Sequence, residues 1–120
     1  MNKVEIGRSH EEYAALFLKD NGIDIIETNY RVKPGEVDLI GFDGDDLVFF
    51  EVKYRKTGDK GFAADSVNLR KQFKICRVSD VYMLTHNIGS DVQIRYDVIA
   101  MDGSKIDWIR NAFDYIPKRQ

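Results

Sequence analysis

The sequence predicts an α/β domain in which a mixed β-sheet is flanked by helices. Two stretches carry apolar side chains at helical spacing, two strongly apolar runs are separated by a glycine-containing turn, and residues 92–101 alternate between apolar and polar side chains. Helical and strand patterns alternate along the chain, as expected for a sheet with helices on its faces. With 120 residues, 43% of them hydrophobic, two prolines and no repeat or linker, residues 1–120 should form a single domain.

The first element is predicted to be an amphipathic helix over residues 9–21. Ser9 can cap its N-terminus, Glu12 is placed to complete a capping box, and Asn21-Gly22 is a typical stop signal. One stripe of this helix should face the core and consists of Glu11, Ala14, Ala15 and Leu18. A carboxylate in a buried stripe needs a partner, although Glu11 could instead serve as a favourable charge near the helix N-terminus.

A strand is expected at residues 23–31, followed by a β-hairpin of residues 36–42 and 47–53. If Gly44 and Asp45 form the centre of the turn, Asp38 lies opposite Glu51, and if Asp43 and Gly44 do, Glu51 lies diagonal to Asp38. In both registers Asp38, Glu51 and Lys53 share one face, whereas a three-residue loop would turn Asp38 to the other face.

The remaining elements follow in order. A loop rich in glycine and lysine is expected at residues 55–64, a helix at 67–86, a strand at 92–101 and a short closing segment at 106–113.

Asp38 and Glu51 lie within apolar runs, where an ionised carboxylate is costly without a cation. Lys53 offsets only one of the three acids Glu11, Asp38 and Glu51. A divalent cation would complete the balance, and because the available ligands are oxygens, Mg²⁺ or Mn²⁺ is favoured over Zn²⁺. The alternative is a surface hairpin with an ordinary charge pair.

Several segments of the sequence together resemble a known family. The segments that carry the resemblance are Gly7-Arg8-x-x-Glu11, Asn29-Tyr30-Arg31, Gly35-Glu36-Val37-Asp38-Leu39-Ile40, Phe50-Glu51-Val52-Lys53-x-Arg55, Arg70-Lys71-Gln72 and Arg95-Tyr96-Asp97-Val98. They resemble the bacterial YraN family of predicted endonucleases, within the PD-(D/E)XK superfamily, and are similar to archaeal Holliday junction resolvases. His10 stands where the family pattern leads us to expect glycine, and Ala63 where we expect proline.

The resemblance implies a restriction-endonuclease-like core and a metal-dependent endonuclease acting on DNA. It implies that Asp38, Glu51 and Glu11 bind Mg²⁺ or Mn²⁺ and that Lys53 stabilises the transition state. Gln72 would add a phosphate or water contact, although a surface glutamine fits equally well. The alternative function is a catalytically silent module that binds nucleic acid or acts as an adaptor.

The net charge of −2 conceals a basic segment. Residues 53–77 carry eight basic and two acidic side chains, a net charge of +6. Such a segment is typical of a surface that contacts nucleic-acid phosphates, although a solvated helix face is the alternative. The candidate nucleic-acid contacts are Arg55, Lys56, Lys60, Arg70, Lys71 and Lys74.

The N-terminus lacks the apolar stretch of a signal peptide, and one cysteine excludes an internal disulfide. We therefore expect a cytoplasmic protein without a membrane partner. A homodimer is left open, because symmetric cleavage of two strands normally requires two-fold symmetry, yet the sequence offers no isolated apolar stripe for the contact.

Overall fold

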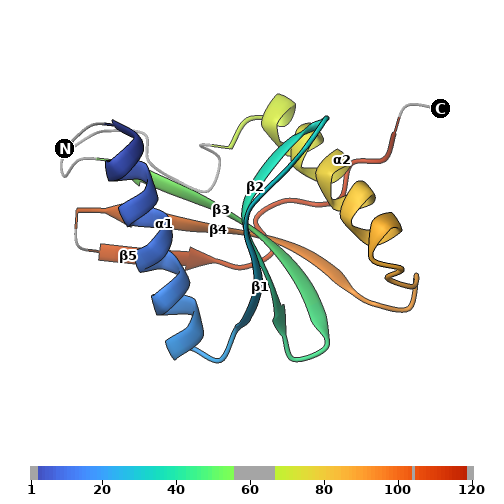
Figure 1. Ribbon diagram of the computed structural model, residues 1–120, viewed down its shortest axis with the longest axis horizontal. Helices are drawn as coiled ribbons and strands as arrows, with labels where there is room; N and C mark the ends of the chain where they lie inside the picture. Colours follow the sequence, from blue (N-terminus) through green and yellow to red (C-terminus); the bar gives the residue numbers. More distant parts are fainter. Residues whose placement is uncertain (1–2, 56–66, 104, 119–120) are drawn as a thin grey trace.

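The computed structural model describes residues 3–55, 67–103 and 105–118, with side chains from residue 9 onward. Its elements in chain order are α1 (Lys3–Asp20), β1 (Asp24–Val32), β2 (Gly35–Asp43), β3 (Asp46–Arg55), α2 (Leu69–Thr85), β4 (Ile94–Asp102) and β5 (Lys105–Ile109). The five strands form one sheet in the order β1-β2-β3-β4-β5 (Figure 1). The predicted α/β class with a mixed sheet and flanking helices is confirmed.

The mixed character of the sheet arises at one position in the chain. β3 and β4 pair in parallel, whereas all other neighbouring strands pair antiparallel. A parallel pair needs a crossover connection, and α2 lies in that connection between β3 and β4. The first turn of α2 is thereby brought close to the end of β3.

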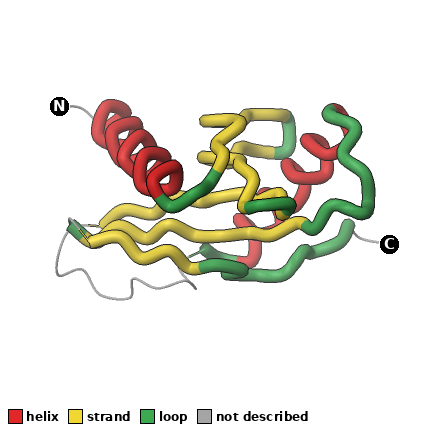
Figure 2. Tube along the Cα trace, turned by 90° about the horizontal axis from the view of Figure 1, so that it is seen from below, coloured by secondary structure: helices red, strands yellow, loops and turns green. Residues whose placement is uncertain are grey.

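The two helices cover opposite faces of the sheet (Figures 1 and 2). Along β3, Leu47 and Phe49 belong to the hydrophobic cluster that includes the buried residues of α2. Val48 and Phe50 point the other way, into the cluster that includes the α1 residues Ala14 and Leu18. Both faces of the central strands are therefore buried, which explains why β4 has no solvent-exposed face in its central part. The alternation predicted for residues 92–101 exists, but both sets of side chains are buried there, Asp97 included.

The predicted start of the first helix was wrong. α1 begins at Lys3, so Ser9 lies inside the helix and does not cap it. Among residues 3–8 Gly7 is the least favourable for a helix, at about 1 kcal/mol, and no proline interrupts the segment, so nothing in it stops the helix. The predicted end is confirmed, because the Ile23 amide donates to the Leu18 carbonyl at 3.0 Å and Gly22 adopts a φ of 90°.

The hairpin register agrees with the first of the two predicted alternatives. Asp43 pairs with Asp46, which leaves Gly44 and Asp45 at the centre of the turn. Gly44 has a φ of 60°, as the first central residue of a tight hairpin turn often requires.

α2 begins within two residues of its predicted start, after the N-cap Asn68. Among the described residues, no helix is long and apolar enough to cross a membrane.

Candidate active site

β2 and β3 separate at the position where their acids would meet. The pairing runs from the turn as far as Leu39 opposite Phe50, and one further step would place Asp38 opposite Glu51. At that step the Val52 amide donates to Asp38 Oδ2 at 2.8 Å, so a carboxylate takes the place of a backbone acceptor. The predicted meeting of Asp38 and Glu51 is therefore present in the structure, at a fork between two strands.

Glu11 approaches the same fork from α1. The nearby side chains of Asn29 and Asp38 favour its ionised carboxylate, whereas the charges of Glu36 and Glu51 disfavour it. Burial, followed by these repulsions, raises the pKa of Glu11. The structure thus brings together the three acids that the sequence predicted, rather than leaving Glu11 as a helix-terminal charge.

Asp38 has a strongly raised pKa. Burial is the largest cause, and the charges of Glu51 and Glu11 add to it, so that the pKa of Asp38 is raised to about 8. The hydrogen bond from Val52 opposes this shift but does not cancel it. These surroundings favour the protonated form of Asp38 when only protein groups surround it.

Two lysines, rather than the one expected, face the acids. Lys53 Nζ lies 3.9 Å from Glu51 Oε2, and Lys71 of α2 forms an ion pair with the same oxygen. Burial, followed by the charge of Lys71, lowers the pKa of Lys53. For Lys71, burial alone would lower the pKa, but the hydrogen bond and charge of Glu51 outweigh it and the pKa is raised. The charge balance of the site thus includes a cation from α2.

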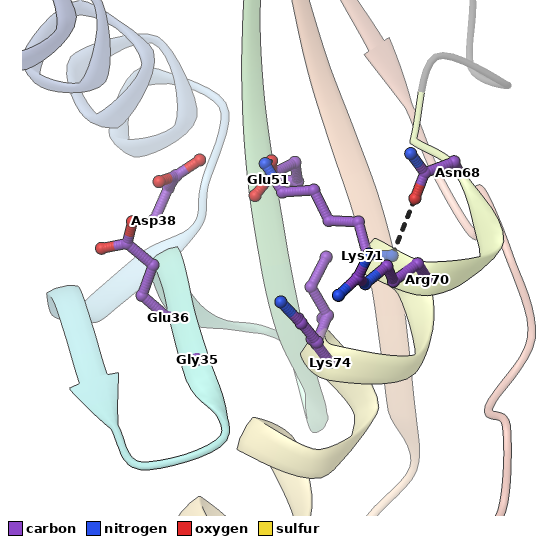
Figure 3. A pocket seen from close by; sticks show the side chains of 9 residues that line it. Gly35, Glu36, Asp38, Glu51, Asn68, Arg70, Lys71 and Lys74 are labelled. Atoms are coloured by element: carbon purple, nitrogen blue, oxygen red, sulfur yellow. Dashed lines mark hydrogen bonds and ion pairs between the residues drawn. The ribbon is translucent and has the colours of Figure 1, made fainter.

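A cleft of about 490 Å³ opens between β2, β3 and the first turns of α2. Figure 3 shows Asp38 and Glu36 on one side of it and the basic side chains of α2 on the other, with Lys71 extending toward Glu51. Three of its lining residues are cationic: Arg70, Lys71 and Lys74. α2 carries no acid in its first turn, so its partly positive N-terminus adds to this charge. A cleft with acids on one wall and cations on the other suits a phosphodiester next to a divalent ion.

A second cavity, of about 430 Å³, lies between α1 and β1. Glu11 lines this cavity, whereas Asp38 and Glu51 line the first one. The three acids therefore lie between two cavities, on opposite sides of the point where β2 and β3 separate.

The other predicted site residues lie in different surroundings. The Gln72 side chain donates to the Val67 carbonyl at 2.8 Å and does not line the cleft. Arg55, at the end of β3, forms an ion pair with Asp102 at 2.8 Å. Lys56 and Lys60, as well as most of the loop predicted at residues 55–64, lie outside the described residues.

Two residues beside the acids were missed by the sequence reasoning. Asn29 of β1 contacts Glu11, and Asn68 both lines the cleft and caps α2, accepting from the Lys71 amide at 2.9 Å. Asn68 was detectable as an N-cap signal before a helix. His10, the departure from the expected glycine, stacks on Tyr54 with ring centroids 3.6 Å apart and thereby ties α1 to β3 beside Glu11.

The carboxylate oxygens of these acids are suitable ligands for a hard divalent cation, but the acids do not form a complete coordination site. Their ligand atoms are all oxygens, and burial together with the charges of Glu51 and Glu11 raises the pKa of Asp38, so an ionised Asp38 lacks a sufficient positive partner among the protein groups. In the described part of the chain, however, no three His, Cys, Asp or Glu side chains are close enough to bind one ion together. Asp38 and Glu51 would have to act as the two direct ligands, with Glu11 joining through water or after a side-chain movement.

The chain is similar over nearly its whole length to bacterial proteins of one family. The family model described as "Uncharacterised protein family UPF0102" matches residues 10–101. A UPF0102 protein of Pseudomonas syringae pv. tomato is 38% identical over 121 residues, covering 93% of this chain and 94% of the relative. UPF0102 proteins of Lachnoclostridium phytofermentans and Legionella pneumophila (strain Corby) are 37% and 39% identical, covering 95% and 92% of this chain and 97% and 95% of the relatives.

Proposed function

The chain belongs to the UPF0102 family, and we propose that it is a metal-dependent nuclease that hydrolyses phosphodiester bonds in DNA. The observation that carries this proposal is the meeting of Glu11, Asp38 and Glu51 at the fork between β2 and β3, opposite a cationic helix turn. The order of these residues along the chain resembles the PD-(D/E)XK superfamily and the YraN-type predicted endonucleases. The five-stranded sheet with a helix on each face is compatible with a restriction-endonuclease-like core.

Each side chain has a role in this proposal. Asp38 and Glu51 would bind Mg²⁺ or Mn²⁺, with Glu11 in a supporting position. The bound ion would neutralise charge on the phosphate and activate the attacking water. Lys53, partly buried beside Glu51, would orient that water and stabilise the charge that develops on the phosphoryl oxygens. Arg70, Lys71 and Lys74 would bind the flanking phosphates.

One finding favours a second function. Lys71 already forms an ion pair with Glu51, and no three described acids or imidazoles form a closed metal site. A module that binds nucleic acid through the basic turn but performs no chemistry would need no such site. Metal affinity separates the two functions, because the silent module has no reason to bind Mn²⁺ at Asp38 and Glu51.

The test is cleavage of labelled linear, branched and single-stranded DNA with Mg²⁺, Mn²⁺ or EDTA. Glu51→Ala should reduce cleavage to background at every Mg²⁺ concentration, because it removes a metal ligand. Lys53→Ala should retain a trace of activity, since loss of one positioned cation costs on the order of 10²- to 10³-fold. Glu12→Ala, an exposed acid next to Glu11, serves as the matched control and should cleave like wild type.

Two results would decide against the proposal. If Glu51→Ala cleaves as fast as wild type, the site is wrong. If wild-type protein binds DNA but cleaves none of these substrates with either metal, the silent module becomes the better account.

A further inference from the structure

Asn29 lies in the same row of the sheet as the acids. Thr28 pairs with Leu39 and Tyr30 with Val37, so the position between them places Asn29 next to Asp38. The next step of the row, across β2 and β3, leads to Glu51. Asn29, Asp38 and Glu51 therefore occupy equivalent positions on three adjacent strands.

The backbone at Asn29 is unusual for the interior of a strand. Its φ is 52°, in the left-handed region that costs an ordinary residue about 1–2 kcal/mol. The other described non-glycine residues with positive φ, Asn87 and Asn111, both lie just after the end of an element, where the chain changes direction. Asn29 lies within the nine residues of β1, beyond the register shift that interrupts the strand between Ile25 and Glu27. Such a local cost is a common sign of a functional constraint.

The left-handed conformation changes the direction of the side chain. Successive residues of a strand normally point to opposite faces, yet Thr28 and Asn29 line the same cavity between α1 and β1. Glu11 lines that cavity too, so the Asn29 amide and the Glu11 carboxylate share one cavity, and the nearby amide favours the ionised form of Glu11. The backbone cost at Asn29 thus coincides with the placement of an amide beside the one candidate acid that a helix supplies.

Glu11 and Asn29 come from two elements that meet at this cavity. Ala14 and Leu18 pack α1 against the sheet, and Asn29 lies on the facing strand β1. An amide donor from β1 is a neutral group that favours the charged carboxylate without competing with a metal ion for it.

We propose that Asn29 is a positioning residue for Glu11, directing its carboxylate toward Asp38 so that the three acids can act on one cation. The contribution to metal binding rests on the proposed function, whereas the contact itself can be tested without metal. Groups that orient a metal ligand typically change metal affinity by 10- to 100-fold when they are removed.

The first measurement is made on the metal-free protein by NMR. The side-chain amide resonances of Asn29 should shift on Glu11→Ala and should stay in place on Glu12→Ala, which removes a carboxylate from the same cavity and leaves Glu11 intact. Unchanged Asn29 resonances in Glu11→Ala would overturn the proposed contact.

The second measurement is Mn²⁺ affinity by calorimetry. Asn29→Gly removes the amide but accepts a positive φ, so the melting temperature should remain close to that of wild type, while Mn²⁺ affinity falls by about tenfold. Asn87→Gly is the matched control, because Asn87 has a φ of 55° and lies at the far end of α2. In the double variant Asn29→Gly/Glu11→Gln the affinity should equal that of Glu11→Gln alone, since both changes act through one carboxylate.

Three outcomes have distinct meanings. Wild-type Mn²⁺ affinity in Asn29→Gly would overturn the positioning role, and so would fully additive losses in the double variant. If wild-type protein binds no Mn²⁺, the proposed function fails, and the NMR experiment still decides whether Asn29 directs Glu11.

Discussion

Asp38 is the candidate site residue whose surroundings should affect the free energy of unfolding most. It is buried, it faces two other acids, and its pKa is raised to about 8 from an ordinary value of 3.8. Between these two values the native state binds a proton that the unfolded chain has lost. The free energy of unfolding should therefore decrease by roughly 1 kcal/mol for each pH unit as the pH rises through this range, as far as this one group is concerned.

We expect Asp38→Asn to remove that dependence. The variant cannot ionise, so in the absence of metal it should be more stable than wild type, and its advantage should grow from pH 5 to pH 8. Urea unfolding at several pH values measures this, with Asp45→Asn in the exposed hairpin turn as the control. Parallel pH profiles for wild type and Asp38→Asn would contradict the assignment of the raised pKa. With saturating Mn²⁺ the order should reverse, because only wild type gains stability from the bound ion.

Lys71 provides a second residue-level prediction. Its ammonium group pairs with Glu51 and so competes with any cation for that carboxylate. Lys71→Gln should therefore increase Mn²⁺ affinity, measured by calorimetry, whereas Lys74→Gln should change it less, since Lys74 lines the same cleft but does not form this ion pair with Glu51. A larger increase in Lys74→Gln would show that general electrostatics, and not the Lys71 contact, governs binding.

At the scale of elements, the first turns of α2 combine two functions. Asn68 caps the helix, and the cationic residues that follow it face the cleft rather than the solvent alone. This arrangement supports the phosphate-binding interpretation of the basic segment over that of a solvated face. The geometry of α2 fixes these charges at one edge of the sheet, close to the end of β3.

Reversing two of these charges tests the interpretation. Arg70→Glu/Lys74→Glu should weaken DNA binding and reduce the slope of log affinity against log salt, because fewer counterions are released. Lys105→Glu/Lys118→Glu changes the net charge equally at exposed positions outside the cleft and should have a much smaller effect. Equal effects in the two double variants would mean that only net charge matters. Fluorescence anisotropy over a range of salt concentrations measures both quantities.

Strand and hairpin patterns predicted more of the site than helix patterns did. The meeting of Asp38 and Glu51 followed from period-two alternation and from a two-residue turn, which together restrict the register to a few choices. The start of α1 was predicted wrongly, since a favourable capping residue does not prevent a helix from extending past it. Lys71 was expected to contact nucleic acid, but its reach to Glu51 depends on the crossover from β3 to α2, which no local pattern encodes. Asn29 was not predicted as a site residue, because the hydrophobic periodicity of a strand does not indicate where a residue adopts a left-handed conformation.

At the scale of the whole molecule, an ionic cluster around the buried Asp97 connects the central hairpin with the strands that follow α2. Asp97 of β4 is fully buried and accepts from Arg95, from the Trp108 indole and from the Asn111 amide. Arg95 also contacts Asp43, at the hairpin turn, at 2.9 Å. The cluster thus connects the β2–β3 turn with β4, β5 and the segment after β5.

Arg95→Met should destabilise the protein by about 3–5 kcal/mol, because the buried Asp97 carboxylate would lose its charged partner. Arg31→Met is the control, since the exposed Arg31–Glu36 pair should contribute no more than about 1 kcal/mol. Chemical denaturation measures both variants. A loss in Arg95→Met as small as that in the control would show that Asp97 is stabilised by its neutral donors alone.

The row of Asn29, Asp38 and Glu51 has a consequence for the order of events in folding. Two consecutive hairpins form it, from segments that are near each other in the chain, whereas the parallel pairing of β3 with β4 must await the crossover through α2. Contacts of short sequence separation tend to form first. Above about pH 8, where Asp38 is ionised, its repulsion by Glu51 should then already act in the transition state, so that Asp38→Asn speeds refolding and leaves the unfolding rate nearly unchanged in stopped-flow experiments at that pH.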